Sequence, residues 1–151
     1  MSKRILVIGS LNMDMVIPVK ELPQKGETIL GGTPDYIPGG KGANQACAAG
    51  KLGGSVTMLG KVGRDAFGQL LLDALKRAGI GTEGVRMDPE AFTTLAFVTF
   101  DDKGERSFSF ARKPGADMFL EEDAVKEEAI RTRAIIHAGS CSLSASPAAA
   151  A

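Results

Sequence analysis

The part of the sequence best suited to bind a small polar ligand is a glycine-rich turn that runs into helix-forming residues. It reads GGKGAN over residues 39–44. Glycines accept positive φ and let other groups approach the backbone, and the first turn of a helix presents unpaired N–H groups. The candidates for binding hydroxyl oxygens or an anion are Gly39, Gly40, Lys41 and Asn44. A tight turn before a buried helix of small residues would give the same pattern.

A second group of polar side chains lies in an alternating segment near the N-terminus. Residues 11–19 alternate, so that Asn12 and Asp14 fall on one side and methionines on the other. The segment follows an apolar run at residues 3–9, which is typical of a strand buried on both faces. Ligands of open α/β sheets bind outside the carboxyl ends of the strands, and a carboxylate there can accept two hydroxyl hydrogens. We therefore expect a polyol site here; a half-exposed strand with one wet face is the alternative.

The elements that must position these residues alternate between strands and helices. Asp65 is a good N-cap for a helix with an apolar stripe that ends at Gly79. The expected strands cover residues 3–9, 11–19, 28–30, 55–59, 95–101, 106–110 and 134–137, and the expected helices cover 43–52, 67–78 and 121–131. This order predicts an α/β fold with a mostly parallel sheet.

A β-hairpin is predicted at residues 95–110, with its turn at residues 102–105. It carries four of the seven phenylalanines, which are Phe97, Phe100, Phe108 and Phe110. So many aromatic side chains on a two-stranded ribbon suggest a small extra sheet that covers a site or pairs with another copy of the chain. Packing of these rings on the main core is the alternative.

Composition excludes several classes of function. The 151 residues fit one domain, and 18 Lys and Arg balance 18 Asp and Glu, so nothing favours nucleic acid or an acidic membrane as a partner. No apolar run is long enough to span a bilayer, and no cleavable signal pattern is present. Cys47, Cys141 and His137 lack the spacing of metal ligands. We expect a cytoplasmic protein with no metal-binding residues in this chain.

Two common nucleotide-binding motifs are not matched. The P-loop requires a glycine five residues before a Gly-Lys pair and Ser or Thr after it, but Asp35 and Gly42 occupy those places around Gly40-Lys41. The dinucleotide fingerprint requires three glycines at the first strand–helix turn, where Gly9 stands alone. Neither motif therefore predicts a nucleotide site in this chain.

Several motifs together resemble the ribokinase family of sugar kinases, also called the phosphofructokinase B family. They read IGSLNMD over residues 8–14, GET over 26–28, GGKGANQA over 39–46, VGRDAFG over 62–68, PGADM over 114–118 and GSCSL over 139–143. The last two are more similar to fructokinases than to ribokinase. The likeness covers almost the whole chain, and the combination is far more specific than any single motif.

The resemblance implies a three-layer α/β/α core with a mostly parallel sheet and a small β-lid, formed by about residues 15–37 and 92–112. It also implies transfer of the ATP γ-phosphoryl group, with Mg²⁺, to a hydroxyl of a fructose- or ribose-like sugar. Because the phenylalanine-rich hairpin and the strand at residues 28–30 should give the lid an apolar face, we also expect a homodimer formed through the lids. The implied sugar-binding positions are Asn12, Asp14, Gly39, Gly40, Lys41 and Asn44, with Phe97 on the lid and Arg112 as weaker candidates.

The sequence also departs from the family pattern. Family members are longer, and their second signature, a Gly-Ala-Gly-Asp stretch that supplies the catalytic base and the anion hole, does not occur in these 151 residues. Because Ser146-Pro147 resembles a helix start with one turn after it, we expect the N-terminal part of a kinase domain, residues 1–151. It should carry the sugar-binding half of the site and be inactive alone. A catalytically silent sugar-binding or lid-mediated interaction module is the alternative.

Overall fold

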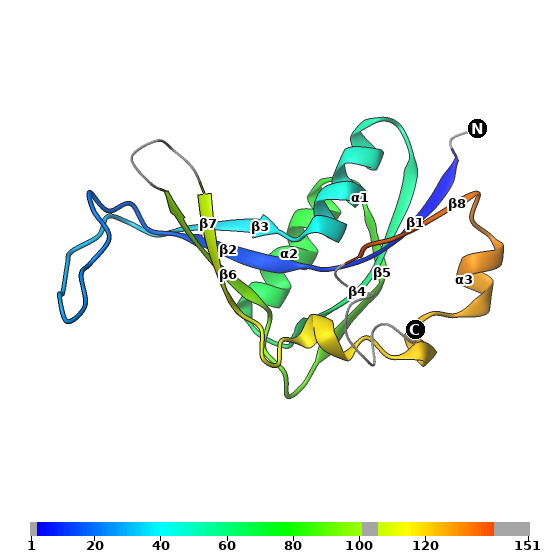
Figure 1. Cartoon of the computed structure of the whole chain (residues 1–151). Coiled ribbons are helices and arrows are strands. Elements are labelled where there is room, and N and C mark those ends of the chain that lie inside the picture. Colours follow the sequence, from blue (N-terminus) through cyan, green and yellow to red (C-terminus); the bar gives the residue numbers. More distant parts are fainter. Residues whose placement is uncertain (1–2, 101–105, 141–151) are drawn as a thin grey trace.

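The computed structural model describes residues 3–100 and 106–140, and its strands form two sheets (Figure 1). In the first, which we call the core sheet, all neighbouring strands are parallel and the order is β5-β4-β1-β8. Its strands are β1 (Arg4–Ile8), β4 (Ser55–Gly63), β5 (Gly81–Asp88) and β8 (Ile135–Ala138). The predicted α/β fold with a parallel sheet is therefore confirmed.

Helical segments cover both faces of the core sheet. One face packs against α1 (Lys41–Lys51) and α2 (Ala66–Arg77) around a core that includes Val7, Met58 and Leu71. The other carries a smaller cluster under the 3₁₀ helices η1 (Ala116–Phe119) and η2 (Glu122–Ala124), with α3 (Glu127–Arg131) following. Among the described residues, no helix is long and apolar enough to cross a membrane.

The helix α2 forms as its sequence predicts. The Asp65 carboxylate caps it by accepting a hydrogen bond of 2.8 Å from the backbone N–H of Gly68. Leu71 and Leu75 are buried against the core, and the chain leaves the helix through Gly79 at a positive φ of 73°. Sequence patterning therefore identifies this helix at both ends.

The second sheet, which we call the small sheet, has the order β3-β2-β6-β7. Its strands are β2 (Asn12–Val16), β3 (Asp35–Gly39), β6 (Leu95–Phe100) and β7 (Arg106–Ala111). The antiparallel β6–β7 pair confirms the predicted hairpin, although the predicted turn at residues 102–105 lies outside the described residues. The four phenylalanines of the hairpin are 40–55% exposed, so the alternative in which they pack on the main core is wrong.

Two predicted elements need correction, and two strands, β3 and β5, were missed. Residues 28–30 are not a strand; they belong to an irregular arm, residues 17–34, that projects from the small sheet (Figure 1), and β3 follows it. The strand β5 was not predicted, because its two glycines and three charged residues interrupt the apolar pattern. The expected helix at residues 121–131 divides into η2 and α3, since the backbone is extended at Lys126 and only Ala124 of these two segments is buried.

Candidate functional site

The glycine-rich turn allows α1 to start directly against the chain that leaves β1. Gly40 is the residue before the helix and has a φ of 104°, which favours glycine. A Cβ atom on Gly42 would lie 2.7 Å from the Cα of Gly9, so no side chain fits between them. The backbone N–H of Ala43 donates to the Ser10 carbonyl at 3.2 Å. The N-terminus of α1 is thereby fixed beside the beginning of β2.

Asn12 and Asp14 meet on β2, as their spacing predicts. The Asn12 side-chain amide donates to Oδ1 of Asp14, and Asn12 is 8% exposed. In the antiparallel β2–β3 pair, Asn12 lies opposite Gly39, and a Cβ atom there would approach Oδ1 of Asp14 to 3.0 Å. The absence of a side chain at Gly39 therefore lets the carboxylate stand close to the turn that leads into α1.

A pocket of about 140 Å³ brings three of the predicted site residues together, namely Asn12, Lys41 and Arg112. Its remaining lining residues are Ser10, Thr94, Phe110 and Asp117. These seven residues come from the link between β1 and β2, the start of β2, the start of α1, the residue before β6, the end of β7 and the segment from Arg112 to η1. The pocket therefore lies where the small sheet joins the core sheet.

An ion pair forms one wall of this pocket. The Arg112 guanidinium donates through Nε at 2.9 Å and lies with Nη2 at 2.8 Å from the same oxygen, Oδ2 of Asp117. The other carboxylate oxygen, Oδ1, accepts a hydrogen bond from the Thr94 hydroxyl. Thr94 and Asp117 are 3% and 5% exposed, so this wall is rigid and largely closed to water.

Thr93, the residue before Thr94, links the pocket wall to α2. Its backbone N–H and its hydroxyl donate to the Asp65 carboxylate at 2.8 and 2.7 Å, and the hydroxyl accepts from the N–H of Gly63 at 3.0 Å. Burial raises the pKa of Asp65, but the hydrogen bonds from Thr93 and Gly68 outweigh it and leave the pKa below its ordinary value. Two adjacent threonines thus hold the helix cap and the pocket wall in a fixed relation.

Five predicted site residues lie outside the pocket lining. Three of them are Asp14 on β2 and Gly39 and Gly40 in the turn before α1; the other two are Phe97 and Asn44. Phe97 is in register with Met15 and lines another groove, of about 320 Å³, with residues of the arm that include Ile17 and Leu22. Asn44 is exposed on the first turn of α1, where its backbone N–H donates to the carbonyl of Gly40. Asn44 therefore lies on α1, the helix whose first residue, Lys41, lines the pocket. Phe97 lies in the groove beside the arm.

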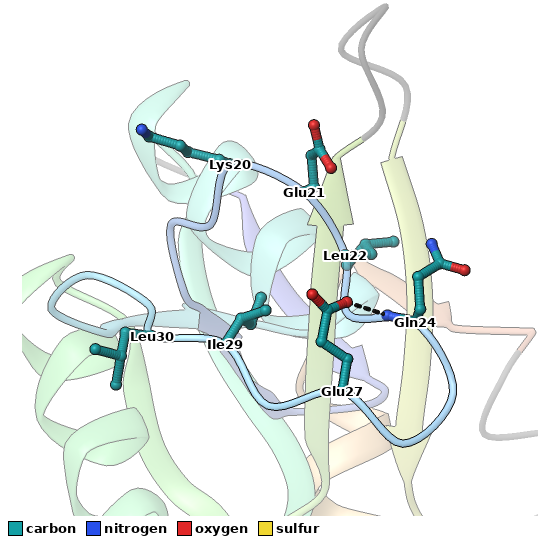
Figure 2. A pocket seen from close by; sticks show the side chains of 7 residues that line it. All are labelled: Lys20, Glu21, Leu22, Gln24, Glu27, Ile29 and Leu30. Carbon is teal, nitrogen blue, oxygen red and sulfur yellow. Dashed lines mark hydrogen bonds between the residues drawn. The ribbon is translucent and has the colours of Figure 1, made fainter.

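A larger hollow, of about 470 Å³, lies within the arm itself (Figure 2). Figure 2 shows one hydrogen bond between its lining residues, which the backbone N–H of Gln24 donates to Oε2 of Glu27 at 2.8 Å. All of its lining residues except Ile29 are exposed, and none is a predicted site residue. Ligand sites need convergent polar groups in a shaped wall, so we assign the site to the smaller pocket.

Comparison with known proteins identifies the family. Residues 2–151 match the model of the pfkB family carbohydrate kinases. The chain belongs to this family. Fructokinase-2 of Oryza sativa subsp. japonica is 50% identical over 110 residues, which are 73% of this chain and 33% of that protein. Probable fructokinase-6, chloroplastic, of Arabidopsis thaliana is 46% identical over 148 residues, which are 97% of this chain and 37% of that protein.

Solved structures of pfkB-type kinases agree with the fold. The fructokinase with bound ATP from Xylella fastidiosa has a TM-score of 0.82 and 34% identity, covering 99% of this chain and 46% of that one. Arabidopsis thaliana ribokinase complexed with ribose and ATP has a TM-score of 0.79 and 31% identity, covering 91% and 45%. The predicted family and its ribokinase-like fold are confirmed, and the chain spans less than half the length of these relatives.

Four pocket residues were not among the predicted sugar-binding positions. Ser10 and Asp117 lie within motifs that carried the family resemblance, and Phe110 lies in the predicted hairpin, but none had a polar pattern of its own. Thr94 is separated from Asp117 by the whole hairpin, so its contact depends on the tertiary fold. One local signal in the sequence could have identified Asp117. It lies five residues after Arg112, and a turn between two such residues can bring them together as an ion pair.

Proposed function

We propose that the full-length protein containing this chain transfers the γ-phosphoryl group of ATP to a hydroxyl of a fructose- or ribose-like sugar. In this proposal the present chain supplies the sugar-binding half of the site. The observation that carries it is the convergence of Asn12, Lys41 and Arg112 on one pocket at the N-terminus of α1. The names of the relatives, fructokinases and a ribokinase, support the same reaction class.

The polar side chains that line the pocket, and Asp14 beside the lining residue Asn12, suit a polyol. The Asp14 carboxylate can accept two hydroxyl hydrogens and is oriented by the Asn12 amide, which retains its carbonyl oxygen as an acceptor. Lys41 and Arg112 can donate to hydroxyl oxygens, and the Phe110 ring offers an apolar surface to the carbon face of a sugar. In this proposal Gly39 and Gly40 form a turn that lets the backbone approach the ligand closely, and the exposed side chain of Asn44 on the first turn of α1 can bond a hydroxyl.

ATP and Mg²⁺ belong to the proposal through the family. ATP is bound in related structures, including the Xylella fastidiosa fructokinase. Within residues 3–100 and 106–140, no group of three or more His, Cys, Asp or Glu side chains could hold a metal ion, so in this proposal Mg²⁺ binds together with the ATP phosphates. Phosphoryl transfer depends on positioning and on stabilisation of charge on the phosphoryl oxygens, and we assign this role to the part of the protein outside this chain.

Two assays on two proteins test the proposed function. We expect fructose or ribose to raise the melting temperature of the full-length protein, because a ligand that binds only the folded state stabilises it by mass action. We also expect ADP release that depends on the sugar from the full-length protein and none from the 151-residue chain alone. Turnover by the purified chain would show that the catalytic base lies within it. Sugar binding without turnover in the full-length protein would favour the silent sugar-binding module instead.

We also propose that the protein forms a homodimer through its small sheets and is located in the cytoplasm. The small sheet and the arm carry several large exposed apolar side chains, among them Ile17, Leu22, Leu30 and Phe108, at 46, 52, 98 and 50%. An exposed apolar surface of this kind commonly marks an association site. The assignment of Phe97 to the sugar stays a prediction, which a substitution of Phe97 can separate from a role in association.

A further inference from the structure

The Arg112 guanidinium at the pocket wall forms an ion pair with the buried carboxylate of Asp117. Both contacting nitrogen atoms of Arg112 face a single oxygen of Asp117, at 2.9 Å from Nε and 2.8 Å from Nη2. The Asp117 side chain is 4% exposed, whereas that of Arg112 is 28% exposed and lines the pocket. The negative charge is therefore covered, while the guanidinium keeps part of its surface at the ligand site.

The carboxylate of Asp117 is itself held in place. Its second oxygen accepts from the hydroxyl of Thr94, and the carbonyl of Thr94 accepts from the backbone N–H of Met13 at 3.0 Å. The backbone N–H of Ala116 donates to the carbonyl of Phe92 at 2.9 Å. A Cβ atom on Gly115 would approach the Thr94 hydroxyl to 2.1 Å, so the hydroxyl occupies the space that a side chain would need. The carboxylate therefore cannot turn away from Arg112 without breaking this packing.

The charges around the pocket balance. Lys41 and Arg112 line it as cations and Asp117 lines it as an anion. Asp14 is outside the lining but supplies a second carboxylate next to it, because it accepts a hydrogen bond from the lining residue Asn12. A site with balanced fixed charges favours an uncharged polyol, because an added ligand carboxylate would find no uncompensated cation to replace its lost hydration.

We propose that Asp117 is a positioning residue that determines specificity. It fixes the guanidinium of Arg112 against the pocket and cancels its charge, so that the site accepts an uncharged sugar and discriminates against a sugar acid. This inference rests on the proposed function, because it concerns the ligand class of the same pocket. It assigns to Asp117 no contact with the sugar.

A matched pair of ligands tests this inference. Fructose and 2-keto-D-gluconate differ only at C1, which is a hydroxymethyl group in one and a carboxylate in the other. Dissociation constants for both are measured by calorimetry on the full-length protein and on its Asp117→Asn variant, which keeps the size of the side chain and an acceptor for Thr94. We expect the wild type to prefer fructose, and the ratio of the two constants to move toward the acid by about tenfold or more in the variant, because an unneutralised guanidinium binds carboxylate strongly.

A second substitution tests whether Arg112 is the source of the added affinity for the sugar acid. In the double variant Asp117→Asn/Arg112→Ala the added affinity for the acid should disappear, because the freed cation is gone. Thr94→Val keeps both charges of the pair but removes the hydroxyl that holds the carboxylate. It should weaken fructose binding several-fold while leaving the ratio of the two ligands unchanged, and it provides the test if the Asp117→Asn variant does not fold.

The possible failures can be told apart. An unchanged ratio in a folded Asp117→Asn variant, with both ligands weakened equally, would show that Asp117 is only structural and would overturn the inference. Unchanged fructose affinity in Thr94→Val would overturn the positioning role, and a wild type that prefers the acid would overturn the specificity. A wild type that binds neither fructose nor any other neutral sugar would instead refute the proposed function, and this inference with it.

Discussion

The core sheet and the small sheet use similar strands in opposite ways. In the core sheet, β1 and β4 have fully buried side chains on both faces, including Leu6, Val7 and Leu59. In the small sheet, Met13 and Ala96 are buried where it meets the core, but every phenylalanine of the hairpin is at least 40% exposed. Burial of apolar surface therefore stabilises the core sheet, whereas the small sheet exposes large apolar side chains that a ligand or another chain could cover.

The difference separates stability from function along the chain. Substitutions in the core should change the free energy of unfolding with little effect on ligand affinity. Substitutions on the small sheet should change binding or association with little effect on unfolding. The following four experiments test this division, from the largest expected effect to the smallest.

The largest effect is expected from Leu71→Ala. Leu71 is 1% exposed in the core under α2, and its truncation removes buried surface and leaves a cavity, at a cost of about 2–5 kcal/mol. The neighbouring Leu70 is 44% exposed, so Leu70→Ala is the matched control and should cost less than about 0.5 kcal/mol. Urea denaturation measures both. Equal costs would show that α2 does not pack as the structure has it.

Next comes Asp14→Ala in the full-length protein. Loss of the charged acceptor should lower kcat/KM for the sugar about tenfold or more, since a hydrogen bond to a charged group is worth about 1.5–3 kcal/mol. The unfolding free energy should change little, because Asp14 lies at a partly exposed position. Asp35→Ala, on the exposed β3 strand paired with Val16, is the control and should leave kcat/KM unchanged. Unaltered sugar affinity in Asp14→Ala would remove this residue from the site.

The third experiment concerns an ion pair at the end of the core sheet. Lys61 lies 2.9 Å from Oδ2 of Asp88 and also donates to the carbonyl of Phe119. Hydrogen bonds from the backbone N–H of Ala91 and from Lys61 lower the pKa of Asp88 to about 2, from an ordinary value of 3.8. Because the folded pKa is depressed, the stabilisation is present above the unfolded pKa and is lost as pH falls through the folded one.

The depressed pKa corresponds to about 2 kcal/mol of stability at neutral pH, lost between about pH 4 and pH 2. In Asp88→Asn, the unfolding free energy should therefore be lower at pH 7 and should fall less steeply across that range. Asp123→Asn is the control, because the Asp123 side chain is 69% exposed in its pair with Arg86 and should change the pH profile little. Parallel profiles for wild type and Asp88→Asn, from thermal melts at a series of pH values, would contradict the assignment.

The sequence predicted the parts of the fold that depend on local patterns. The buried strand at residues 3–9, the capped helix after Asp65 and the hairpin after residue 95 each have a distinct periodicity or cap, and each is present. The strand β5 was missed because its own composition, with Gly81 and Gly84, does not favour a strand. It is a strand because it pairs with β4. The strand β3 was missed because Pro38 and Gly39 do not favour a strand, although β2 pairs with it over five residues.

The site was predictable to the same degree. Asn12 and Asp14 follow from alternation within one strand, and the turn before α1 follows from its glycines, so the structure brings Asn12 and Lys41 to one pocket. The contact of Thr94 with Asp117 joins residues 23 positions apart across the hairpin, and no local pattern encodes it. Phe97 was proposed only through the family resemblance, and the face that it occupies depends on its register with Met15.

The smallest effect on stability, and the sharpest division between the two roles of the small sheet, is expected from Phe97→Ser. Phe97 is 40% exposed and lines the groove with Ile17 and Leu22 of the arm, whereas Phe110 lines the sugar pocket. If the small sheets associate, Phe97→Ser should raise the dimer dissociation constant by about tenfold, because a large apolar side chain is lost from the interface. Sedimentation at micromolar concentration measures this, with Leu52→Ser, at an 89% exposed position at the end of α1, as the control.

Sugar affinity decides what Phe97 does. Phe97 lies in a different groove from Asn12 and Arg112, so Phe97→Ser should leave the dissociation constant for the sugar within about twofold of the wild type, as expected for a substitution outside the pocket. Phe110→Ser should have the reverse effect, because the loss of the ring removes one wall of the pocket. A variant Phe97→Ser that stays dimeric but loses its sugar would restore the prediction made from the sequence and place Phe97 over the ligand. A wild-type protein that sediments as a monomer would show that the small sheet does not mediate association.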